Sequence, residues 1–364
     1  MIAKAAVLEA FREPLTMREF NVCSLADGEV LVRIRAAGVC GSDVHMWHGK
    51  DPRTPLPMIL GHEGVGEVAE ICGVKRDVFG RELRPGDPVM WERGIMCGCC
   101  YYCVIEKQPA LCTSRQTYGI SLSCEEPPHL RGCYAEFVHL MPGAHLIRLD
   151  EGMDPAVLVA ASCSGATAAH AVELSRVGKG DIVLILGPGP LGLFCLAWAL
   201  EMGAAEVYVA GTAADAGRLE LCKQFGAAGT IDVEATTLDE RSELVREATN
   251  GVGMNAVIDC TGVTSAFAEN LEYVAPYGTY SIPGIATPVG DVAVPFFEAL
   301  SRKNVCLQGV WVSDTAHLLQ AVRLVASGRY PFDRLVTHRF PLTQATEALE
   351  VMASREAIKA VLIP

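Results

Sequence analysis

A glycine-rich turn near the middle of the chain most narrows the folds that this sequence can adopt. Residues 187–192 (G-P-G-P-L-G) follow the apolar run 182–186 directly and open a helical pattern that runs towards Met202. In a strand–turn–helix unit, the first glycine makes the tight turn and the second lets a pyrophosphate approach the backbone. The third glycine allows the helix to pack closely on the strand. The turn therefore predicts a dinucleotide-binding unit, and the alternative is a purely structural Gly-Pro loop.

The pattern around this turn divides the chain into two kinds of sequence. From about 164 to 311, apolar strand cores at 182–186, 207–210, 256–258 and 279–282 alternate with helical segments, which implies a parallel sheet covered by helices. Residues 1 to about 160 contain short apolar runs, such as 30–34, between Gly, Pro and Asp turns, which is typical of a mostly β domain. The last fifty residues add helices near 316–327 and 344–353 and a strand at 360–363.

The strand after the glycine-rich turn ends without the acidic residue that commonly binds the adenosine ribose. It runs into Gly211 and Thr212, which leave room and a hydroxyl donor for a 2′-phosphate. Arg218 is a candidate counter-charge, although it could equally be a solvated helix residue, and Asp215 could still reach a ribose hydroxyl. At this point both NAD and NADP remain open.

Composition excludes several classes of protein. A chain of 364 residues is long enough for about two domains, and a mean hydropathy of +0.27 argues against disorder. The 43 acidic and 30 basic residues give a net charge of −13, which disfavours binding to nucleic acid. No apolar run reaches the length of about 20 residues that a membrane span needs. The N-terminus lacks the apolar core of a signal peptide. We therefore expect a cytoplasmic protein that binds neither nucleic acid nor a membrane.

Fifteen cysteines in a long chain without a signal peptide indicate metal binding rather than a disulfide framework. Cys97, Cys100 and Cys103 follow a C-x-x-C-x-x-C spacing, and Cys112 closes the loop. Four thiolates at these spacings suit one closed, tetrahedral zinc site that braces a lobe. Cys99 is a surplus fifth thiol. The alternatives are a chance cluster and a redox-active pair.

A second set of possible ligands is scattered along the chain. It consists of Cys40-Gly-Ser42-Asp43-Val-His45, of Gly61-His62-Glu63 and of Cys163. Singly, each residue has an ordinary structural explanation: His62 as a core histidine, Glu63 as a turn carboxylate, and Cys163 as a small apolar residue. Spacing alone does not show that they converge.

With these motifs in this order, the chain resembles the zinc-dependent medium-chain dehydrogenase/reductase family, the group of alcohol, sorbitol and threonine dehydrogenases, over essentially its whole length. The resemblance implies that Cys40, His62 and Cys163 bind a catalytic zinc, with Glu63 as an alternating ligand, and that each chain holds two Zn²⁺ ions. Polyol dehydrogenases have a glutamate where this chain has Cys163, so the ligand set is similar to that of the alcohol dehydrogenases.

The resemblance also implies roles in catalysis. Zinc would act as a Lewis acid on an alcohol whose hydride passes to a nicotinamide. Ser42 would take the alcohol proton and His45 would pass it to solvent, while Asp43 would orient His62. The structural alternative for Ser42 and Asp43 is a polar turn.

Further residues are expected at the cofactor and the substrate. The cofactor residues are Gly187, Gly189, Pro190, Leu191, Gly192, Gly211, Thr212, Arg218, Thr167 and Lys359. Because Gly41 stands where the family often has a basic residue, Lys359 is expected to carry the phosphate contact alone. Arg93 lies four residues before Cys97 and would select an anionic substrate group; alternatively it turns outward or bonds Glu92. Trp47 and Trp91 could line the same cleft or be core aromatics.

We therefore expect a mixed α/β chain with a GroES-like, mostly β catalytic domain at 1–163 and 312–364. A Rossmann domain with a doubly wound parallel sheet would cover 164–311, with the active site between the two. The expected function is that of a zinc-dependent NAD(P) alcohol dehydrogenase acting on a primary or secondary alcohol, with an anionic or polar substituent favoured. The alternatives are a polyol or amino-alcohol dehydrogenase and a non-catalytic relative that binds zinc and nucleotide. A homodimer or homotetramer would form through the Rossmann edge near 276–295.

Overall fold

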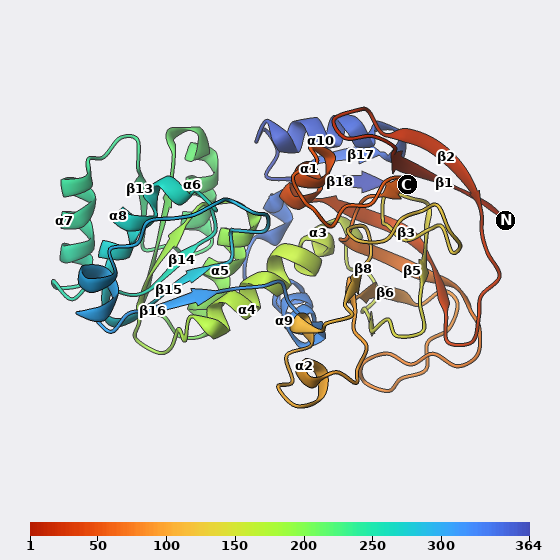
Figure 1. Cartoon of the computed structure of the whole chain (residues 1–364), viewed down its shortest axis with the longest axis horizontal. Coiled ribbons are helices and arrows are strands. Elements are labelled where there is room, and N and C mark those ends of the chain that lie inside the picture. Colours follow the sequence, from red (N-terminus) through yellow and green to blue (C-terminus); the bar gives the residue numbers. More distant parts are fainter. The chain divides into compact units, whose positions relative to one another are not determined.

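The computed structural model describes residues 1–364, which form two compact units (Figure 1). Unit 1 comprises Met1–Cys163, Ser313–Gly328 and Phe332–Pro364, and unit 2 comprises Ser164–Val312 and Arg329–Pro331. The expected boundary at residue 312 lies one residue before the observed one, and residues 329–331 belong to unit 2 rather than to the expected first domain.

Local contacts explain why Val312 and Arg329–Pro331 belong to unit 2. The carbonyl of Val312 accepts a hydrogen bond from His170 Nδ1 at 2.8 Å. The hydroxyl of Tyr330 donates to the carboxylate of Glu201 at 2.8 Å, and its ring stacks on Phe225. His170, Glu201 and Phe225 all belong to unit 2, and their contacts hold both segments to it.

Unit 1 is built mainly from antiparallel strands. Its strands are β1 (Ile2–Leu8), β2 (Thr16–Asn21), β3 (Val30–Val39), β4 (Met58–Ile59), β5 (Gly64–Ile71), β6 (Pro88–Trp91), β7 (Gly94–Ile95), β8 (Gln116–Thr117), β9 (Phe137–Leu140), β10 (Leu146–Arg148), β17 (Val336–Pro341) and β18 (Lys359–Ile363). Its helices are α1 (Gly41–Trp47), α2 (Tyr101–Val104), α3 (Pro155–Ala160), α9 (Thr315–Ala326) and α10 (Ala345–Ala353).

The C-terminal strand completes the large sheet of unit 1. The order of that sheet is β10-β6-β5-β3-β18-β17, with β9 also paired to β3, while β2-β1-β4 and β7-β8 form smaller sheets. Strand β18 pairs antiparallel with β3, so that Ala360 lies opposite Val39. The last residues of the chain are therefore needed to cover β3, whose end leads into Cys40 and α1. The mostly β character expected for this part of the chain is confirmed.

Unit 2 is a parallel sheet with helices around it (Figure 1). Its strands are β11 (Ile182–Leu186), β12 (Glu206–Gly211), β13 (Gly229–Asp232), β14 (Met254–Asp259), β15 (Val274–Ile282) and β16 (Cys306–Gly309), and its helices are α4 (Ala166–Leu174), α5 (Pro190–Glu201), α6 (Ala216–Gln224), α7 (Leu238–Ala248) and α8 (Phe267–Glu272). The order β13-β12-β11-β14-β15-β16 reverses direction at β11. The expected Rossmann fold is confirmed, and the glycine-rich turn follows the strand at the switch point, where such sheets bind ligands.

One helical stretch, Pro155–Leu174, is long and apolar enough to cross a membrane by length and composition alone. The expectation that no apolar run reaches this length is wrong, because small alanines between the branched residues make the stretch apolar without an obvious hydrophobic block. In the structure, 72% of its most apolar window is buried inside the protein. It is therefore a core helix of this fold.

The glycines of the turn 187–192 have different structural duties. Gly187 adopts φ +97°, a left-handed conformation that favours glycine. A Cβ added to Gly192 would collide with the carbonyl oxygen of Gly187, whereas a Cβ on Gly189 would meet nothing within 4 Å. Gly192 is therefore required for packing α5 on the turn, and Gly189 is not required by the fold.

We expect Gly192→Ala to destabilise the protein by about 1–3 kcal/mol, because the new methyl group overpacks the junction between β11 and α5. Gly189→Ala is the matched control, and it should keep the wild-type melting temperature. Thermal unfolding followed by circular dichroism measures both variants. Equal melting temperatures for the two variants would contradict this division of roles.

Candidate functional site

Four side chains that are far apart in the sequence meet in unit 1. Cys40, His62, Glu63 and Cys163 each offer one ligand atom, and these atoms lie within 4.8 Å of one another. The Sγ atoms of Cys40 and Cys163 are 3.9 Å apart. A tetrahedral zinc with Zn–S bonds of about 2.3 Å separates two thiolates by about 3.8 Å. The donor set and its spacing therefore fit zinc, and the structure brings together the residues whose convergence the sequence left open.

Each of these ligands sits at a break in regular structure. Cys40 follows β3 and is the N-cap residue of α1, and Cys163 lies in a π-helical turn, Ala161–Gly165, between α3 and α4. His62 and Glu63 precede β5 and follow Gly61, which adopts φ +92°. A Cβ at Gly61 would collide with the ring of Tyr134. A glycine is therefore required immediately before the two ligands.

A buried carboxylate organises this cluster. Asp43 Oδ1 lies 3.1 Å from His62 Nδ1, and Asp43 Oδ2 accepts hydrogen bonds from the Cys40 backbone N–H at 2.8 Å and from the Tyr134 hydroxyl at 3.1 Å. This pairing leaves Nε2 of His62 for a metal, and Ser42 Oγ lies 3.3 Å from that nitrogen. Asp43 thus fixes both the orientation of His62 and the start of α1.

The same carboxylate sets the protonation of the histidine. Burial alone would lower the pKa of His62, but Asp43, and then Cys40, raise that pKa to about 10. A metal that binds Nε2 must therefore displace a proton.

Glu63 and Lys359 form a second buried pair beside the ligands. The Glu63 carboxylate and the Lys359 ammonium are in direct ionic contact, and both side chains are almost completely buried. Neither carboxylate oxygen of Glu63 accepts a hydrogen bond of good geometry. A Cβ on Gly38 of β3 would collide with this carboxylate. The expected phosphate contact of Lys359 stays a prediction.

Arg93 approaches the cluster from a different side. It is only 3% exposed, and its Nη1 donates to the carbonyl of Ser162 at 2.8 Å. Its Nη2 donates to Ser313 Oγ at 3.4 Å. Arg93 therefore does not turn outward, and the carboxylate of Glu92 instead accepts bonds from the Gly94 N–H and from Arg115.

The thiols respond to these neighbours. The hydrogen bond from Cys40 lowers the pKa of Cys163, and the positive charge of Arg93 lowers it further against the effect of burial. The hydrogen bond to Cys163 raises the pKa of Cys40 well above its usual value. Both shifts follow from the geometry of the pair, in which Cys40 Sγ donates to Cys163 Sγ.

The two tryptophans proposed for the substrate cleft have structural contacts. Trp91 is 1% exposed, and its ring occupies the space that a Cβ on Gly64 would need. Trp47 is half-buried, stacks on His48, and donates its indole N–H to the carbonyl of Glu13 at 2.7 Å. Their roles in substrate binding stay predictions.

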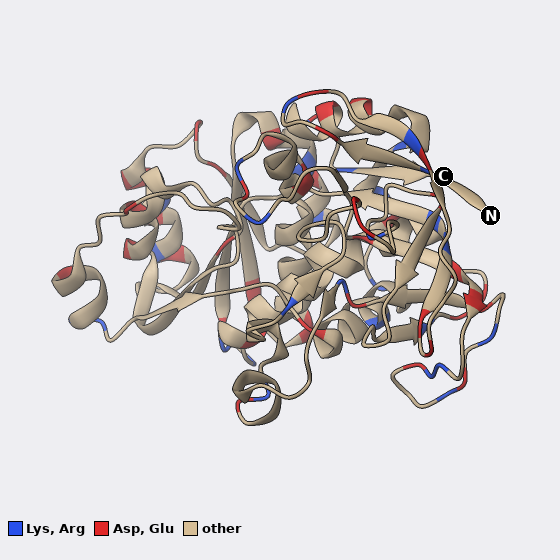
Figure 2. Ribbon diagram, turned by 45° about the vertical axis from the view of Figure 1, so that its right-hand side comes forward, with Lys and Arg blue, Asp and Glu red and all other residues tan.

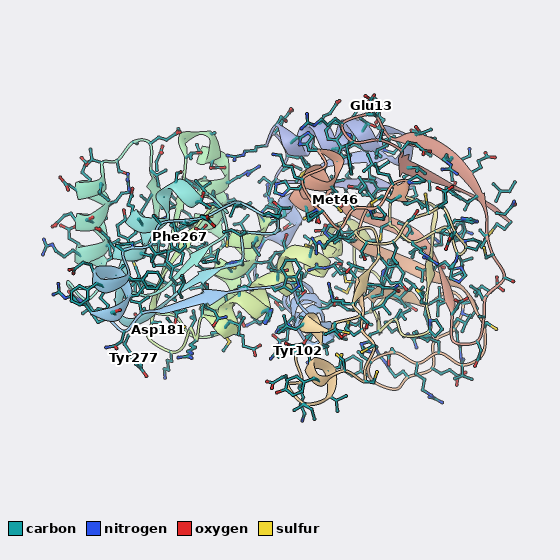
Figure 3. The ribbon with its side chains drawn as sticks, viewed as in Figure 1. Glu13, Met46, Tyr102, Asp181, Phe267 and Tyr277 are labelled. Atoms are coloured by element: carbon teal, nitrogen blue, oxygen red, sulfur yellow. The ribbon has the colours of Figure 1, made fainter.

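A second cluster of ligands lies in the loop that carries α2. Its members are Cys97, Cys100, Cys103 and Cys112, whose ligand atoms lie within 4.8 Å of one another. The sulfur atoms are 3.5 Å apart in the pair Cys97–Cys112 and 3.6 Å apart in the pair Cys100–Cys103. Backbone N–H groups of Thr113 and Cys103 lower the pKa of Cys100 to about 6. Cys99 is exposed and stands outside this group, so Cys112 is the fourth member. Figure 3 labels Tyr102 on this loop.

In unit 2, the glycine-rich turn 187–192 lies next to the end of β12. A Cβ on Gly211 would lie 2.9 Å from Pro188 Cγ, so the turn itself disfavours a larger side chain there. The Thr212 backbone N–H and hydroxyl donate to Asp215 Oδ2 at 3.1 and 2.8 Å, and Arg218 pairs with Asp215 Oδ1 at 3.5 Å. Asp215 therefore caps the chain after β12. Thr167 lies in the first turn of α4.

Sequence motifs did not identify every residue of the site. Tyr134 and Gly38 were missed, because a buried tyrosine and a strand glycine carry no local signature. The only available signal for Gly38 was its position near the end of a strand that leads to Cys40.

Comparison with known proteins agrees with this geometry. Residues 26–151 match the model of the alcohol dehydrogenase GroES-like domain, and residues 190–327 match that of the zinc-binding dehydrogenase domain. The chain is 32% identical over 365 residues to 5-exo-hydroxycamphor dehydrogenase of Pseudomonas putida, covering 99% of this chain and 98% of that protein.

Two solved structures have the same fold as this chain over its whole length. An alcohol dehydrogenase from Thermotoga maritima superposes with a TM-score of 0.96 at 44% identity, covering 100% of both chains. A zinc-binding dehydrogenase from Sinorhizobium meliloti 1021, bound to NADP, superposes with a TM-score of 0.86 at 26% identity, also over 100% of both chains. The chain thus belongs to the zinc-dependent medium-chain dehydrogenase/reductase family, as its motifs predicted.

Proposed function

We propose that this protein is a zinc-dependent NAD(P) alcohol dehydrogenase that transfers hydride reversibly between a primary or secondary alcohol and a nicotinamide. The observation that carries the proposal is the meeting of Cys40, His62 and Cys163 with Ser42 beside them. The glycine-rich turn after β11 supplies the nucleotide site. Cys163 favours an alcohol dehydrogenase over the polyol enzymes of the same family, which have a glutamate at that position.

Two metal sites follow from the two ligand clusters. Cys40, His62 and Cys163 would hold the catalytic zinc with Glu63 as a further ligand, and the four cysteines of the α2 loop would hold a structural zinc. A zinc ion with three protein ligands and an open position polarises an alcohol oxygen and lowers its pKa. A zinc ion surrounded by four thiolates has no open position and stabilises the lobe instead.

Ser42 and His45 are the residues of this chain proposed to move the proton. Ser42 Oγ lies 3.3 Å from His62 Nε2, the atom that would hold the metal, so its hydroxyl is placed to accept a hydrogen bond from an alcohol there. His45 lies one helical turn further along α1. Burial, together with the charge of Lys50, lowers the pKa of His45 below 6.5. The neutral imidazole, which accepts protons, is therefore its dominant form at neutral pH.

The end of β12 supports weak discrimination between NAD and NADP. The strand itself ends in Gly211, with Thr212 after it, rather than in an acidic residue, and Arg218 is paired with Asp215 rather than dedicated to a phosphate. We propose that both cofactors are accepted.

We also propose a homodimer or homotetramer that forms through the Rossmann edge. Strand β16 ends the sheet and pairs only with β15, which leaves backbone groups without a strand partner on one side. Apolar side chains are exposed nearby: Tyr277 is 85% exposed (Figure 3), and Phe296 and Phe297 are each 66% exposed.

Other partners and the compartment follow from charge and cysteine chemistry. Acidic and basic residues are interspersed along the ribbon (Figure 2), and the acidic ones are in excess, so we propose no nucleic-acid partner. All fifteen cysteines are free thiols, which supports a reducing, cytoplasmic location.

The function is tested by following nicotinamide reduction with NAD and NADP across matched neutral and anionic alcohols. We expect turnover with both cofactors and KM values that differ by less than about tenfold, a free-energy difference of about 1.4 kcal/mol. Cys163→Ala should lose about one zinc per chain and its turnover, because the open metal site loses a ligand. Nucleotide binding without oxidation of any alcohol would instead identify a non-catalytic relative. Full activity in metal-depleted Cys163→Ala would contradict the catalytic zinc.

The structural zinc site is tested by substituting two neighbouring cysteines, one inside and one outside the cluster. Cys100→Ala should lose about one zinc per chain and lower the melting temperature, since binding of a structural metal contributes folding free energy. Cys99→Ala is the matched control, because Cys99 lies outside the cluster, and it should keep two zinc ions. Elemental analysis and thermal unfolding give both readouts. Retention of both ions and of the melting temperature in Cys100→Ala would show that the site is misassigned.

The proton path is tested by the pH dependence of kcat. His45→Ala should slow alcohol oxidation by about tenfold or more near pH 6, where solvent is a poor base, and less at high pH. The sign follows from the lowered pKa of His45, which keeps the imidazole unprotonated to pH values below 6.5. His48→Ala is the control, because His48 stacks on Trp47. Superimposable pH profiles for His45→Ala and wild type would remove His45 from the mechanism.

A further inference from the structure

Arg93 contacts the chain beside both of the main points where it passes between the two units. The chain leaves unit 1 after Cys163 and returns to it at Ser313. The guanidinium of Arg93 donates to the Ser162 carbonyl at 2.8 Å and to Ser313 Oγ at 3.4 Å. Ser162 and Ser313 are 2% and 0% exposed, so both bonds lie in the protein interior. A single buried side chain thus connects two segments that are 151 positions apart, from 162 to 313.

The backbone at both junctions departs from regular structure. Cys163 lies in the π-helical turn Ala161–Gly165, a kind of turn that is frequent at functional sites. Val312 adopts φ 46°, which is unfavourable for a β-branched residue and persists only where its surroundings enforce it. His170 Nδ1 holds the carbonyl of Val312, and Arg93 holds the next residue, Ser313. The conformation of each junction therefore depends on specific buried contacts.

The position of Arg93 also matters electrostatically. Burial would lower the pKa of its guanidinium, but Cys163, Glu92 and Cys40 raise that pKa, so the side chain stays charged. Lys359 already compensates Glu63. Arg93 adds a further positive charge next to a cluster that contains two thiols.

We propose that Arg93 is a positioning residue that holds the Cys163 segment and the Ser313 junction in place and thereby keeps the catalytic metal bound. A substrate anchor would have to offer its N–H groups to the substrate, whereas Nη1 and Nη2 of Arg93 both donate to protein oxygens. The consequence for turnover rests on the proposed function. The consequence for metal retention can be measured without any substrate.

The test measures zinc release to a chromogenic chelator from wild type, Arg93→Lys and Arg93→Met, each loaded with two zinc ions. Loss of groups that orient metal ligands typically costs 10- to 100-fold in metal affinity. We expect one zinc in Arg93→Met to be released at least about tenfold faster, and the zinc of the four-cysteine site to be released as in wild type. Arg93→Lys keeps the charge but not the fork, so its release rate should lie between the two.

A spectroscopic readout and a matched control separate this role from general destabilisation. With Co²⁺ at the catalytic site, Arg93→Met should shift the d–d bands and the thiolate-to-cobalt charge-transfer band, because the geometry at Cys163 changes. Arg241→Met is the control: Arg241 is largely buried in unit 2, donates to the Val233 carbonyl at 3.0 Å and pairs with Glu269. It should lower the melting temperature but leave zinc release and the cobalt spectrum unchanged.

Three results would overturn the proposal. The first is wild-type zinc release and an unchanged cobalt spectrum in folded Arg93→Met or, if that variant does not fold, in Arg93→Lys. The second is a raised KM for anionic alcohols alone, with metal retention intact, which would make Arg93 a substrate anchor. The third is equally fast zinc release from Arg241→Met. Failure of the proposed function is distinguishable, because wild type itself would then bind no metal at Cys163 or reduce no nicotinamide.

Discussion

Unit 1 depends on burying an anionic ligand set without leaving its charge uncompensated. Cys40, Glu63 and Cys163 converge where isolated charges would be costly. Cys40 and Cys163 share a hydrogen bond, and Glu63 is in ionic contact with Lys359. A divalent metal would complete this compensation. Strand β18 brings in Lys359, which explains why the end of the chain must return to the large sheet of unit 1.

The same requirement explains several details of local structure in physical terms. Gly38 leaves space for the Glu63 carboxylate, and Gly61 leaves space for the ring of Tyr134, whose hydroxyl bonds Asp43. Asp43 in turn orients His62. Glycines also set the spacing in the glycine-rich turn of unit 2. Gly192 permits close packing on Gly187, whereas the space that a Cβ of Gly189 would occupy is empty. Glycine positions thus determine how closely ligands and backbone approach.

Local motifs predicted the parts of this arrangement that are encoded by short spacing. The strand 182–186, the turn after it and the four-cysteine lobe could all be located because their residues are neighbours in sequence. Contacts between distant segments could not be located in this way. Arg93 reaches Ser313 across 220 positions, and Tyr134 reaches Asp43 across 91. Periodicity and spacing contain no information about such pairs, so the surroundings of the ligands required the structure, whereas the family resemblance supplied the ligands themselves.

The central claim is that each chain holds one zinc bound by two thiolates and a histidine and another bound by four thiolates. Zinc K-edge absorption spectroscopy of the purified protein tests it most directly. Two sulfur ligands at one site and four at the other give (2 + 4)/2, an average of about three sulfur neighbours per zinc, at about 2.3 Å. In Cys100→Ala, the remaining zinc should show about two sulfur neighbours and one imidazole. An average of four sulfurs, or no imidazole scattering in that variant, would contradict the account.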